Sequence, residues 1–507
     1  MTFAVAAMCA GTLFAAPEID VSPDRVKTPL AVDMERIGTL RPRSTHEIEA
    51  SNWTIDAMCV DRDFADFDKY APYLERLGIK KLRLQCGWYK SEKTKGAYDV
   101  AWLDHIVDES LRMGVEPIME LSYGNPLYEG GGGAGVAGGM PNKPEGLAAW
   151  DRWVGFLAAH FKDRIREWAM WNEPDCTWGR KISPEEIAAF NIRSARILRE
   201  AMPKARLHAL SLAFSRPSFL EKCIKALGED AKLFDTFIYH GYAENPDFSY
   251  TNVEKMKDVV RRLAPHAVLR QGENGCPSEY LSRFGLAHVP WTEYSQAKWD
   301  MRRMLGDLGH DVESSVFGIV DIQYRPPTYP VEFANRKGLL RTNESNDVVR
   351  IKRAYYAVQN VASVFDCDVV RVKKPAVSRK DPDIALYEYK MRDGSPLFVF
   401  WNRGPVDWDP KKRKSSVRED ARPGDGFATR PCVLEYAGRA LREPVWVDLL
   451  TGRAYRFPAE NQIEHSCGVT FVDVPFYDSP CFIAERTALR LDPAPSFITP
   501  RTCAARK

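Results

Sequence analysis

Short apolar runs alternate with amphipathic segments along most of the chain, and this alternation limits the fold more than any other feature. Eight runs have the length and composition of buried strands: Trp53–Val60, Lys81–Gln85, Val115–Tyr123, Ile165–Trp171, Leu207–Leu212, Phe234–His240, Ala267–Gln271 and Ser315–Ile322. Segments with helical apolar spacing lie between them. Eight strand–helix units favour an α/β fold of the (β/α)8 TIM-barrel type over residues 46–365, although counting alone leaves a doubly wound open sheet as the alternative.

The pattern changes after residue 365, where short strand-like runs are separated by Gly, Pro and Asp. The runs are Ile384–Tyr389, Pro396–Trp401, Val433–Tyr436, Val445–Leu450 and Phe471–Pro475. They predict a C-terminal antiparallel β-sandwich domain over residues 366–490 and a loose tail over residues 491–507. We expect the sandwich to brace the barrel. If it bound glycans on its own, Trp401 and Trp446 would be the candidate platforms.

The first 16 residues are apolar and rich in small side chains, which is typical of a secretory signal peptide. We therefore expect an exported protein, secreted or periplasmic, in which residues 17–45 lead into the barrel. Attachment of a lipid at Cys9 is a weaker alternative, because the bulky Met8 precedes it. No later stretch reaches the roughly 18 apolar residues that a membrane-spanning helix needs.

Charge balance and cysteine spacing argue against several classes of function. Lys and Arg number 71 and Asp and Glu number 69, so nothing predicts a nucleic-acid or membrane-surface partner. The 11 Cys residues are scattered singly, with neither the spacing of a zinc site nor that of a disulfide framework. The sequence also lacks H-E-x-x-H, a Walker loop and G-x-S-x-G, so it predicts no metal and no other cofactor. It does not indicate an oligomeric state.

One predicted strand ends abruptly on polar residues. The run that ends at Trp171 is followed by Asn172, Glu173 and Pro174, and proline cannot donate a hydrogen bond within a sheet. A carboxylate is therefore placed at the C-terminal end of a buried strand, where parallel α/β folds carry their chemistry. An isolated Asn-Glu-Pro could instead only pair with a nearby Arg, so the functional interpretation needs a second group.

A second carboxylate stands in a similar setting. The run Ala267–Gln271 leads directly into Gly272 and Glu273, and Gly275 follows two residues after Glu273. The flanking glycines predict a sharp turn that leaves the Glu side chain reachable. Glu173 ends the fourth predicted strand and Glu273 the seventh, so they lie on nearly opposite barrel walls. Glycoside hydrolysis requires two such carboxyls: one protonates the leaving oxygen, and the other attacks the anomeric carbon or activates water.

The stretch Trp171, Asn172, Glu173 and Pro174 resembles the strand-four signature of the clan A glycoside hydrolases, which are retaining (β/α)8 enzymes. The resemblance implies that Glu173 is the general acid/base and that Asn172 holds the sugar 2-hydroxyl. It also implies that Glu273 is the nucleophile, because the nucleophile of the clan ends strand seven.

The resemblance extends to groups around the nucleophile and covers roughly residues 50 to 350. His240 and Tyr242 resemble the His-x-Tyr arrangement of the clan, in which the Tyr hydrogen-bonds the nucleophile, and Arg83 resembles the arginine that supports the same carboxylate. The barrel followed by a sandwich is most similar to family 39, with family 5 as the second choice. Much of the clan has a Trp platform after strand eight, where this sequence offers Tyr324.

Further candidates for substrate binding lie near the ends of predicted strands two and three. Gln85 ends strand two, Trp88 could stack on a sugar or pack in the core, and Asn125 could bind a hydroxyl. We expect Glu92, in a charged loop, to be solvated. The Gly-rich stretch 130–139 contains G-x-G-x-x-G, but prolines follow where a dinucleotide site needs a helix, so it predicts a flexible rim loop.

These features together predict a retaining glycoside hydrolase that cleaves glycosidic bonds, with β-linkages favoured, in an oligo- or polysaccharide by double displacement. A non-catalytic carbohydrate-binding protein on a barrel scaffold is an alternative from another class, and an inverting hydrolase is a third. The identity of the sugar cannot be predicted, because it depends on side chains in loops whose conformation the sequence does not reveal.

Overall fold

The structure of the protein is a computed structural model that describes residues 15–176, 181–404 and 426–494. Most of the predicted signal peptide, including Cys9, lies outside the described residues, as does the predicted tail beyond residue 494. No helix in these three ranges is long and apolar enough to cross a membrane.

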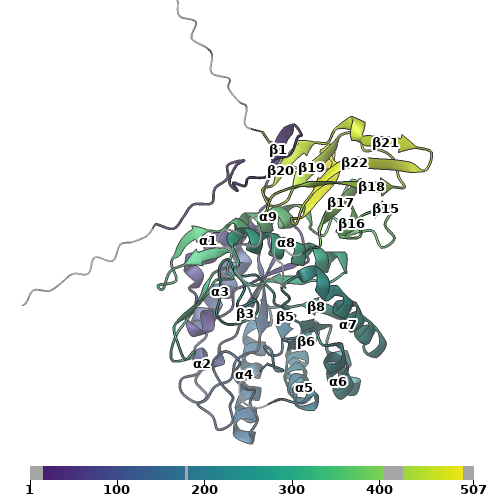
Figure 1. The fold of residues 1–507 in the computed structure, drawn as a ribbon. Helices are drawn as coiled ribbons and strands as arrows, with labels where there is room; N and C mark the ends of the chain where they lie inside the picture. The colour runs from purple at the N-terminus through teal and green to yellow at the C-terminus, as the bar shows by residue number, and fades with distance from the viewer. Residues whose placement is uncertain (1–14, 177–180, 405–425, 495–507) are drawn as a thin grey trace, which may run out of the picture.

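Eight parallel strands form a barrel, which confirms the predicted (β/α)8 fold (Figure 1). They neighbour one another in chain order: β2 (Trp53–Asp56), β3 (Lys81–Gln85), β4 (Glu116–Glu120), β5 (Glu167–Ala169), β6 (Arg206–Leu212), β7 (Thr236–Tyr239), β8 (Val268–Gln271) and β9 (Ser314–Val316). β9 pairs with β2, and a bridge between Arg270 and Glu313 closes the ring between β8 and β9. The carboxyl ends of all eight strands therefore meet at one mouth.

Helices cover the outside of the barrel (Figure 1). They are α1 (Phe67–Leu77), α2 (Trp88–Ser91), α3 (Ala101–Arg112), α4 (Pro144–Phe161), α5 (Pro184–Ala201), α6 (Pro217–Leu227), α7 (Tyr250–Leu263), α8 (Glu293–Gly309) and α9 (Arg353–Val364). α1 shows why such segments form amphipathic helices: Phe67, Tyr70, Leu74 and Leu77 repeat at helical spacing and are all buried. Two hairpins, β10 (Ile322–Tyr324) with β11 (Phe333–Asn335) and β12 (Leu340–Thr342) with β13 (Val348–Ile351), follow β9.

An antiparallel β-sandwich follows the barrel, as predicted (Figure 1). Its larger sheet has the order β14-β16-β17-β23-β19-β20-β1-β24 and its smaller sheet the order β15-β18-β22-β21. The bounds are β1 (Arg36–Leu40), β14 (Val370–Arg371), β15 (Val377–Arg379), β16 (Ile384–Lys390), β17 (Pro396–Asn402), β18 (Arg430–Tyr436), β19 (Pro444–Asp448), β20 (Arg453–Arg456), β21 (Gln462–His465), β22 (Gly468–Phe476), β23 (Cys481–Glu485) and β24 (Leu491–Pro493).

The larger sheet is apolar on both faces. Along β17, Phe398 and Phe400 join the core between the two sheets, whereas Leu397, Val399 and Trp401 join the core shared with the barrel. This alternation follows from the two-residue repeat of a strand. The sheet therefore lies between the barrel and the smaller sheet.

Trp401 and Trp446 are not glycan platforms, which corrects the alternative raised from the sequence. Both side chains are fully buried. Trp401 Nε1 donates a hydrogen bond to Asp247 at 2.9 Å, and Trp446 Nε1 donates to the carbonyl of Pro475 at 2.9 Å. Neither ring has a free face on which a sugar could stack.

The segments before and after the two domains contribute strands that the sequence analysis did not assign. Arg36–Leu40, within the lead segment, forms β1 and pairs with β20 on one side and with β24 on the other. β24, Leu491–Pro493, lies in the segment predicted as a loose tail. Such short strands carry little local signal, and only pairing with distant partners reveals them.

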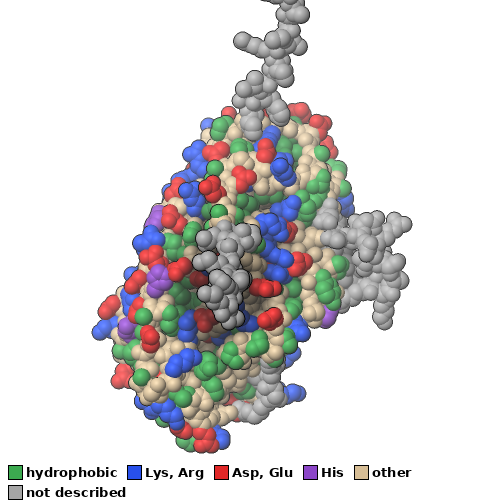
Figure 2. All heavy atoms as spheres, turned by 90° about the vertical axis from the view of Figure 1, so that its left-hand side faces the viewer, with side chains coloured by type: hydrophobic (Ala, Val, Ile, Leu, Met, Phe, Trp, Pro, Cys, Tyr) green, Lys and Arg blue, Asp and Glu red, His purple; other side chains and the backbone are tan. Residues whose placement is uncertain are grey.

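Helix α8 joins the barrel to the sandwich. Every residue of α8 from Ser295 to Gly309 is buried, including the charged side chains in that stretch. Lys298 forms an ion pair with Asp478 at 2.6 Å, and Arg302 donates to the carbonyls of Arg403 and Gly404. On the outer face shown in Figure 2, basic and acidic side chains are interspersed among the described residues, in keeping with the near-neutral charge.

Candidate active site

A cavity of about 1100 Å³ opens at the carboxyl ends of the barrel strands. Its wall includes Glu173 after β5, Tyr242 after β7 and Glu273 after β8, together with the exposed rings of Phe214 and Phe248. Its volume lies slightly above the range of about 300–1,000 Å³ that is usual for small-molecule sites.

Glu173 reaches the cavity because the chain leaves the barrel sheet early. β5 ends at Ala169 rather than at the predicted Trp171. The N–H of Glu173 donates to the carbonyl of Ser211 at 3.0 Å, at the irregular end of β6. Glu173 has a φ of 46°, a left-handed conformation that costs a non-glycine residue roughly 1–2 kcal/mol. Its side chain remains 23% exposed and borders the cavity.

The glycines beside Glu273 allow close packing rather than the predicted sharp turn. Neither Gly272 nor Gly275 has a positive φ. A Cβ atom on Gly272 would lie 2.2 Å from a side-chain carbon of Ile238, and one on Gly275 would lie 1.9 Å from the carbonyl oxygen of Phe317. The segment is therefore held tightly between β7 and the end of β9, and Glu273 keeps 10% of its side chain exposed.

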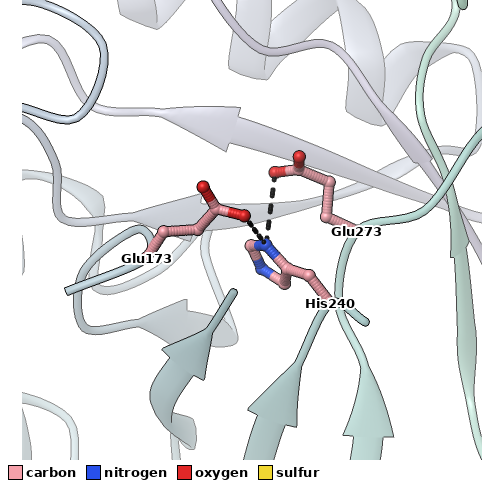
Figure 3. A group of neighbouring side chains, drawn as sticks. All are labelled: Glu173, His240 and Glu273. Carbon is pink, nitrogen blue, oxygen red and sulfur yellow. Dashed lines mark hydrogen bonds and ion pairs between the residues drawn. The ribbon is translucent and has the colours of Figure 1, made fainter. Parts of the chain in front are cut away.

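His240 lies between the two carboxyl groups (Figure 3). Its Nδ1 atom is 2.8 Å from Oε1 of Glu173 and 3.7 Å from Oε2 of Glu273. One oxygen of each carboxyl and a nitrogen of His240 all lie within 4.8 Å of one another. The two carboxyl groups are thus close enough to act on one bond of a bound ligand.

Arg83, from β3, holds the floor of the site together. Its Nη1 atom donates to Glu273 Oε2 at 2.7 Å, Nη2 donates to Asn172 Oδ1 at 2.6 Å and Nε donates to Glu120 at 2.9 Å. Nη1 also lies 3.3 Å from a carboxyl oxygen of Asp56. A planar guanidinium with donors in a fixed fork can meet several carboxyls at once, which a lysine could not.

Neighbouring groups of opposite charge set the ionisation of Glu273 and of His240. Burial alone would raise the pKa of Glu273, but the positive charges of His240 and Arg83, with hydrogen bonds from Arg83 and Tyr242, hold that pKa below its usual value. Burial opposes a charge on His240, yet the anions of Glu273 and Glu173 raise its pKa above the ordinary value. Glu273 is therefore kept as an anion.

Asp56 behaves differently from Glu273, although both contact Arg83. Burial raises the pKa of Asp56 to about 8, and the nearby charge of Glu273 adds to the effect against the opposing charge of Arg83. Asp56 accordingly retains a proton near neutral pH.

Glu173, His240 and Glu273 carry the atom types that divalent cations bind, so we tested whether the cluster fits a metal. Glu273 already accepts hydrogen bonds on both oxygens, from Arg83 at 2.7 Å and from Tyr242 at 3.0 Å. The buried guanidinium would also repel a second cation. The donor set fits a hydrogen-bonded acid pair better than a metal centre.

Several residues predicted to bind substrate do meet at the cavity. Asn172, Tyr242 and Tyr324 all line it. The hydrogen bond implied between Tyr242 and Glu273 is present, as is the ion pair between Arg83 and Glu273. Tyr324 packs edge-on against Phe64, with ring centroids 5.1 Å apart.

Gln85, Trp88 and Asn125 are fully buried and do not line the cavity, so the structure does not support their predicted contacts with substrate. Gln85 Nε2 donates to Glu120 at 3.1 Å, Trp88 Nε1 donates to Glu92 at 2.5 Å and Asn125 Nδ2 donates to the carbonyl of Glu92 at 2.9 Å. Glu92 is therefore a buried acceptor rather than a solvated charge.

The loop at residues 130–139 folds back on itself through main-chain hydrogen bonds. The Gly133 N–H donates to the Gly139 carbonyl at 3.1 Å, and the Gly138 N–H donates to the Gly135 carbonyl at 2.9 Å. Val136 and Ala137 line the cavity. This loop forms part of the cavity wall, a role that its composition did not reveal.

Sequence reasoning missed many further residues of the wall, among them Arg62, Tyr123, Phe317 and Lys337. Tyr123 accepts a hydrogen bond from Asn172 at 2.7 Å. Phe317 directly follows β9, which is where much of the clan has its strand-eight platform. The predicted eighth strand, Ser315–Ile322, was too long, so Phe317 was placed inside it rather than after it. Lys337 lies beyond the β10–β11 hairpin and has no local sequence signal.

Neither protein-family models nor curated proteins gave a match to this chain. Several solved structures, in contrast, are similar to this chain. A family 39 glycoside hydrolase from the gut symbiont Bacteroides cellulosilyticus WH2 is similar over 86% of this chain and 81% of its own, with 15% identity and a TM-score of 0.60.

Two further solved structures are similar to nearly the same share of this chain. A monomeric beta-xylosidase from Caulobacter crescentus CB15 is similar over 89% of this chain and 97% of its own, with 12% identity and a TM-score of 0.55. The catalytic domain of a family 30 xylanase C from Talaromyces cellulolyticus is similar over 89% and 98%, with 11% identity and a TM-score of 0.55. At these identities the likeness concerns the fold, and this chain has the barrel-and-sandwich fold of the clan A glycoside hydrolases.

Proposed function

We propose that the protein is a retaining glycoside hydrolase in which Glu173 is the general acid/base and Glu273 is the nucleophile. The observation that carries the proposal is the approach of the two carboxyls, whose nearest oxygens lie within 4.8 Å of each other beside one cavity. Retaining enzymes hold their carboxyls about 5–5.5 Å apart, whereas inverting enzymes need about 6.5–9.5 Å to admit a water.

In the first step, the Glu273 carboxylate attacks the anomeric carbon and forms an ester bond to it. The glycosidic carbon–oxygen bond breaks, and the leaving oxygen takes the proton of Glu173. In the second step, Glu173 takes a proton from water, the water oxygen bonds to the anomeric carbon, and Glu273 departs as a carboxylate.

The surrounding groups support these two roles. Arg83 and Tyr242 favour the anionic form of Glu273 that attack requires. His240 is a positioning residue, since its hydrogen bond at 2.8 Å fixes one oxygen of Glu173 and leaves the other for the leaving group. Asn172 is placed between Arg83 and Tyr123 at the cavity wall, where its amide could exchange a partner for a sugar hydroxyl.

The substrate class we propose is an oligo- or polysaccharide, with β-linked sugars as the first to test. A β-xylosidase among the proteins that share the fold supports this choice. We further propose that the enzyme acts outside the cytoplasm, and the apolar N-terminal segment of the sequence supports this proposal.

The role of Glu173 can be tested by measuring how the hydrolysis rate of a Glu173 variant depends on the leaving group of the substrate. Loss of a general acid costs about 10²–10⁴-fold in rate. Glu173→Gln should impose that loss on glycosides with poor leaving groups and spare aryl glycosides with activated ones in the first step. An equal loss on both kinds of substrate would argue against the assignment.

Covalent trapping of the intermediate distinguishes a retaining hydrolase from the two alternatives. An activated 2-fluoro glycoside should attach covalently to Glu273, as intact mass and peptide mapping would show. Sugar binding without turnover or labelling would favour the carbohydrate-binding alternative. Release of the inverted anomer first would favour the inverting one.

A further inference from the structure

One side of the cavity carries polar groups that the proposed chemistry does not use. We call it the strand-eight wall, and it consists of Arg62, Tyr324, Asn335 and Lys337. All four line the cavity and all are at least nine-tenths buried. Tyr324 connects three of them, because Asn335 hydrogen-bonds its hydroxyl and Arg62 lies close enough to affect its ionisation. Lys337 lies two residues beyond Asn335.

Lys337 is the most unusual member of the wall. It is only 2% exposed, yet no ion pair or hydrogen bond joins its ammonium to another described residue. The ammonium instead lies 4.6 Å from the ring centroid of Tyr242 and 6.0 Å from that of Phe317. Burial lowers the pKa of Lys337 to about 8, so the group still carries its charge at neutral pH.

Other buried lysines of the described chain have carboxylate partners. Lys298 forms an ion pair with Asp478 at 2.6 Å, and Lys352 forms one with Asp321 at 2.6 Å. A buried charge without a partner destabilises a fold, so a protein keeps one where something else compensates it. The contrast indicates that the partner of Lys337 comes from outside the chain.

Two further atoms of the wall point to the same conclusion. Arg62 Nη1 and Asn335 Oδ1 are buried and have no hydrogen-bond partner among the described residues. The first can only donate and the second can only accept. An anionic group would satisfy Arg62 and Lys337, and a neighbouring hydroxyl would satisfy Asn335.

The wall adjoins the nucleophile rather than the acid. Tyr242 donates to Glu273 at 3.0 Å, and its ring faces the ammonium of Lys337. A sugar attacked by Glu273 would therefore bring its substituents against this wall. The charge of Glu273 does not forbid an anion there, because Arg83 neutralises it at 2.7 Å.

We propose that the strand-eight wall is a subsite for an anionic substituent, a carboxylate or a sulfate ester, on the sugar that Glu273 attacks, with Lys337 as its main contact. The proposal rests on the proposed function for the position of the sugar. It narrows the substrate class to glycans that contain uronic acids or sulfated sugars.

The experiment is calorimetric titration of the full chain with matched pairs of free sugars. The pairs are D-glucuronate with D-glucose, D-galacturonate with D-galactose, and N-acetylglucosamine 6-sulfate with N-acetylglucosamine. At least one anionic sugar should bind about 10–100-fold more tightly than its neutral counterpart, the usual value of a hydrogen bond to a charged group. The first two pairs test a carboxylate and the third a sulfate.

Variants test whether Lys337 causes the preference for anionic sugars. Lys337→Met should reduce the preference to parity, and Lys337→Arg should retain most of it. Lys93→Met is the matched control, because Lys93 also places its ammonium over a ring, at 3.5 Å from the Tyr89 centroid, but is exposed and does not line the cavity. It should leave the preference unchanged.

The proposal is overturned if no anionic sugar binds better than its counterpart, or if the preference survives Lys337→Met. Hydrolysis of aryl glycosides of both the neutral and the anionic sugars by the same preparations keeps the two proposals apart. Turnover without an anion preference rejects the subsite and leaves the hydrolase standing. An anion preference without any turnover supports the subsite and counts against the hydrolase.

Discussion

The two ends of the barrel hold charge clusters of opposite balance, partly buried at the amino end and more deeply buried at the carboxyl end. At the amino end, two carboxylates, Glu167 and Glu313, meet three cations: Lys81, Arg206 and Arg270. At the carboxyl end, four carboxyls gather around only two groups that can be cationic: Asp56, Glu120, Glu173 and Glu273 around Arg83 and His240.

The ionisation of the two clusters follows this difference. At the amino end, burial is outweighed by Arg270 and Arg206, which lower the pKa of Glu313 to about 2, and Glu167 is likewise held well below its usual pKa. At the carboxyl end, the pKa of Asp56 rises to about 8 while that of Glu273 falls. Sufficient cations fix every carboxylate as an anion, whereas a deficit leaves a proton to be shared, which acid–base chemistry needs.

The largest effect on turnover is expected when an anion is removed from the cluster at the carboxyl end of the barrel. Glu273→Gln should lower turnover by about 10⁴-fold or more, because no other described carboxylate can form the covalent intermediate. The melting temperature should fall less than in Glu313→Gln, because Arg83 keeps the carboxyl groups of Glu120 and Asp56 as partners. Steady-state kinetics and calorimetry check both parts, and retained turnover would contradict the comparison.

The second prediction concerns the ion pairs at the amino end of the barrel. Glu313→Gln leaves Arg270 without its carboxylate partner and leaves Arg206 with Glu167 alone. It should lower the free energy of unfolding by about 3 kcal/mol, at the low end for a buried pair because Glu313 is 24% exposed. Turnover per folded molecule should stay within about twofold of that of the unaltered protein. A large loss of turnover at unchanged stability would reverse the assignment of the two ends.

The pH dependence of Glu313→Gln gives a second readout. The folded pKa of Glu313, about 2, lies below its unfolded value of about 4.3. Its stabilisation is therefore present above about pH 4.3 and is lost as the pH falls towards 2. Denaturant unfolding should show that the unaltered protein loses more stability than Glu313→Gln across this window.

A smaller effect concerns the histidine between the carboxyls. His240→Gln removes the positive charge that contributes most to the low pKa of Glu273. The acid limb of the kcat/KM profile should therefore move to higher pH by about one unit, which corresponds to about 1.4 kcal/mol. His208→Gln is the matched control, because His208 is also buried beside a glutamate, Glu167, but at the amino end; it should leave the limb in place.

The smallest effect is expected at Asp56. Because Asp56 keeps its proton below its pKa of about 8, Asp56→Asn exchanges one neutral side chain for another of the same shape. At pH 6–7 turnover should fall by less than about threefold. A loss near that of Glu273→Gln would show that Asp56 works as an anion.

The sequence predicted the elements whose signal is local. Glu173 and Glu273 were found because each follows a short apolar run, and parallel strands bring such ends to one mouth. Arg83 was found through resemblance, but its contacts with Asp56 and Glu120 were not, although both acids end their strands.

What the sequence could not predict depends on burial and on distant pairing. Trp88 and Asn125 follow strands just as Glu173 does, and only the structure shows that they bind Glu92 inside the wall. Gly275 was assigned a turn, whereas a close approach of Phe317 requires it. Lys337 stands out only because no carboxylate of the described residues comes close enough to form an ion pair with it.

The strand β1 has a consequence for the order in which the protein folds. It completes a sheet whose other strands come from the far end of the chain, and the ion pair of Arg41 with Asp492 beside it joins positions 451 residues apart. During synthesis, β1 must therefore wait with both edges unpaired until almost the whole chain has emerged. A chaperone that shields residues 36–40 would act at the step that commits this protein to its native state.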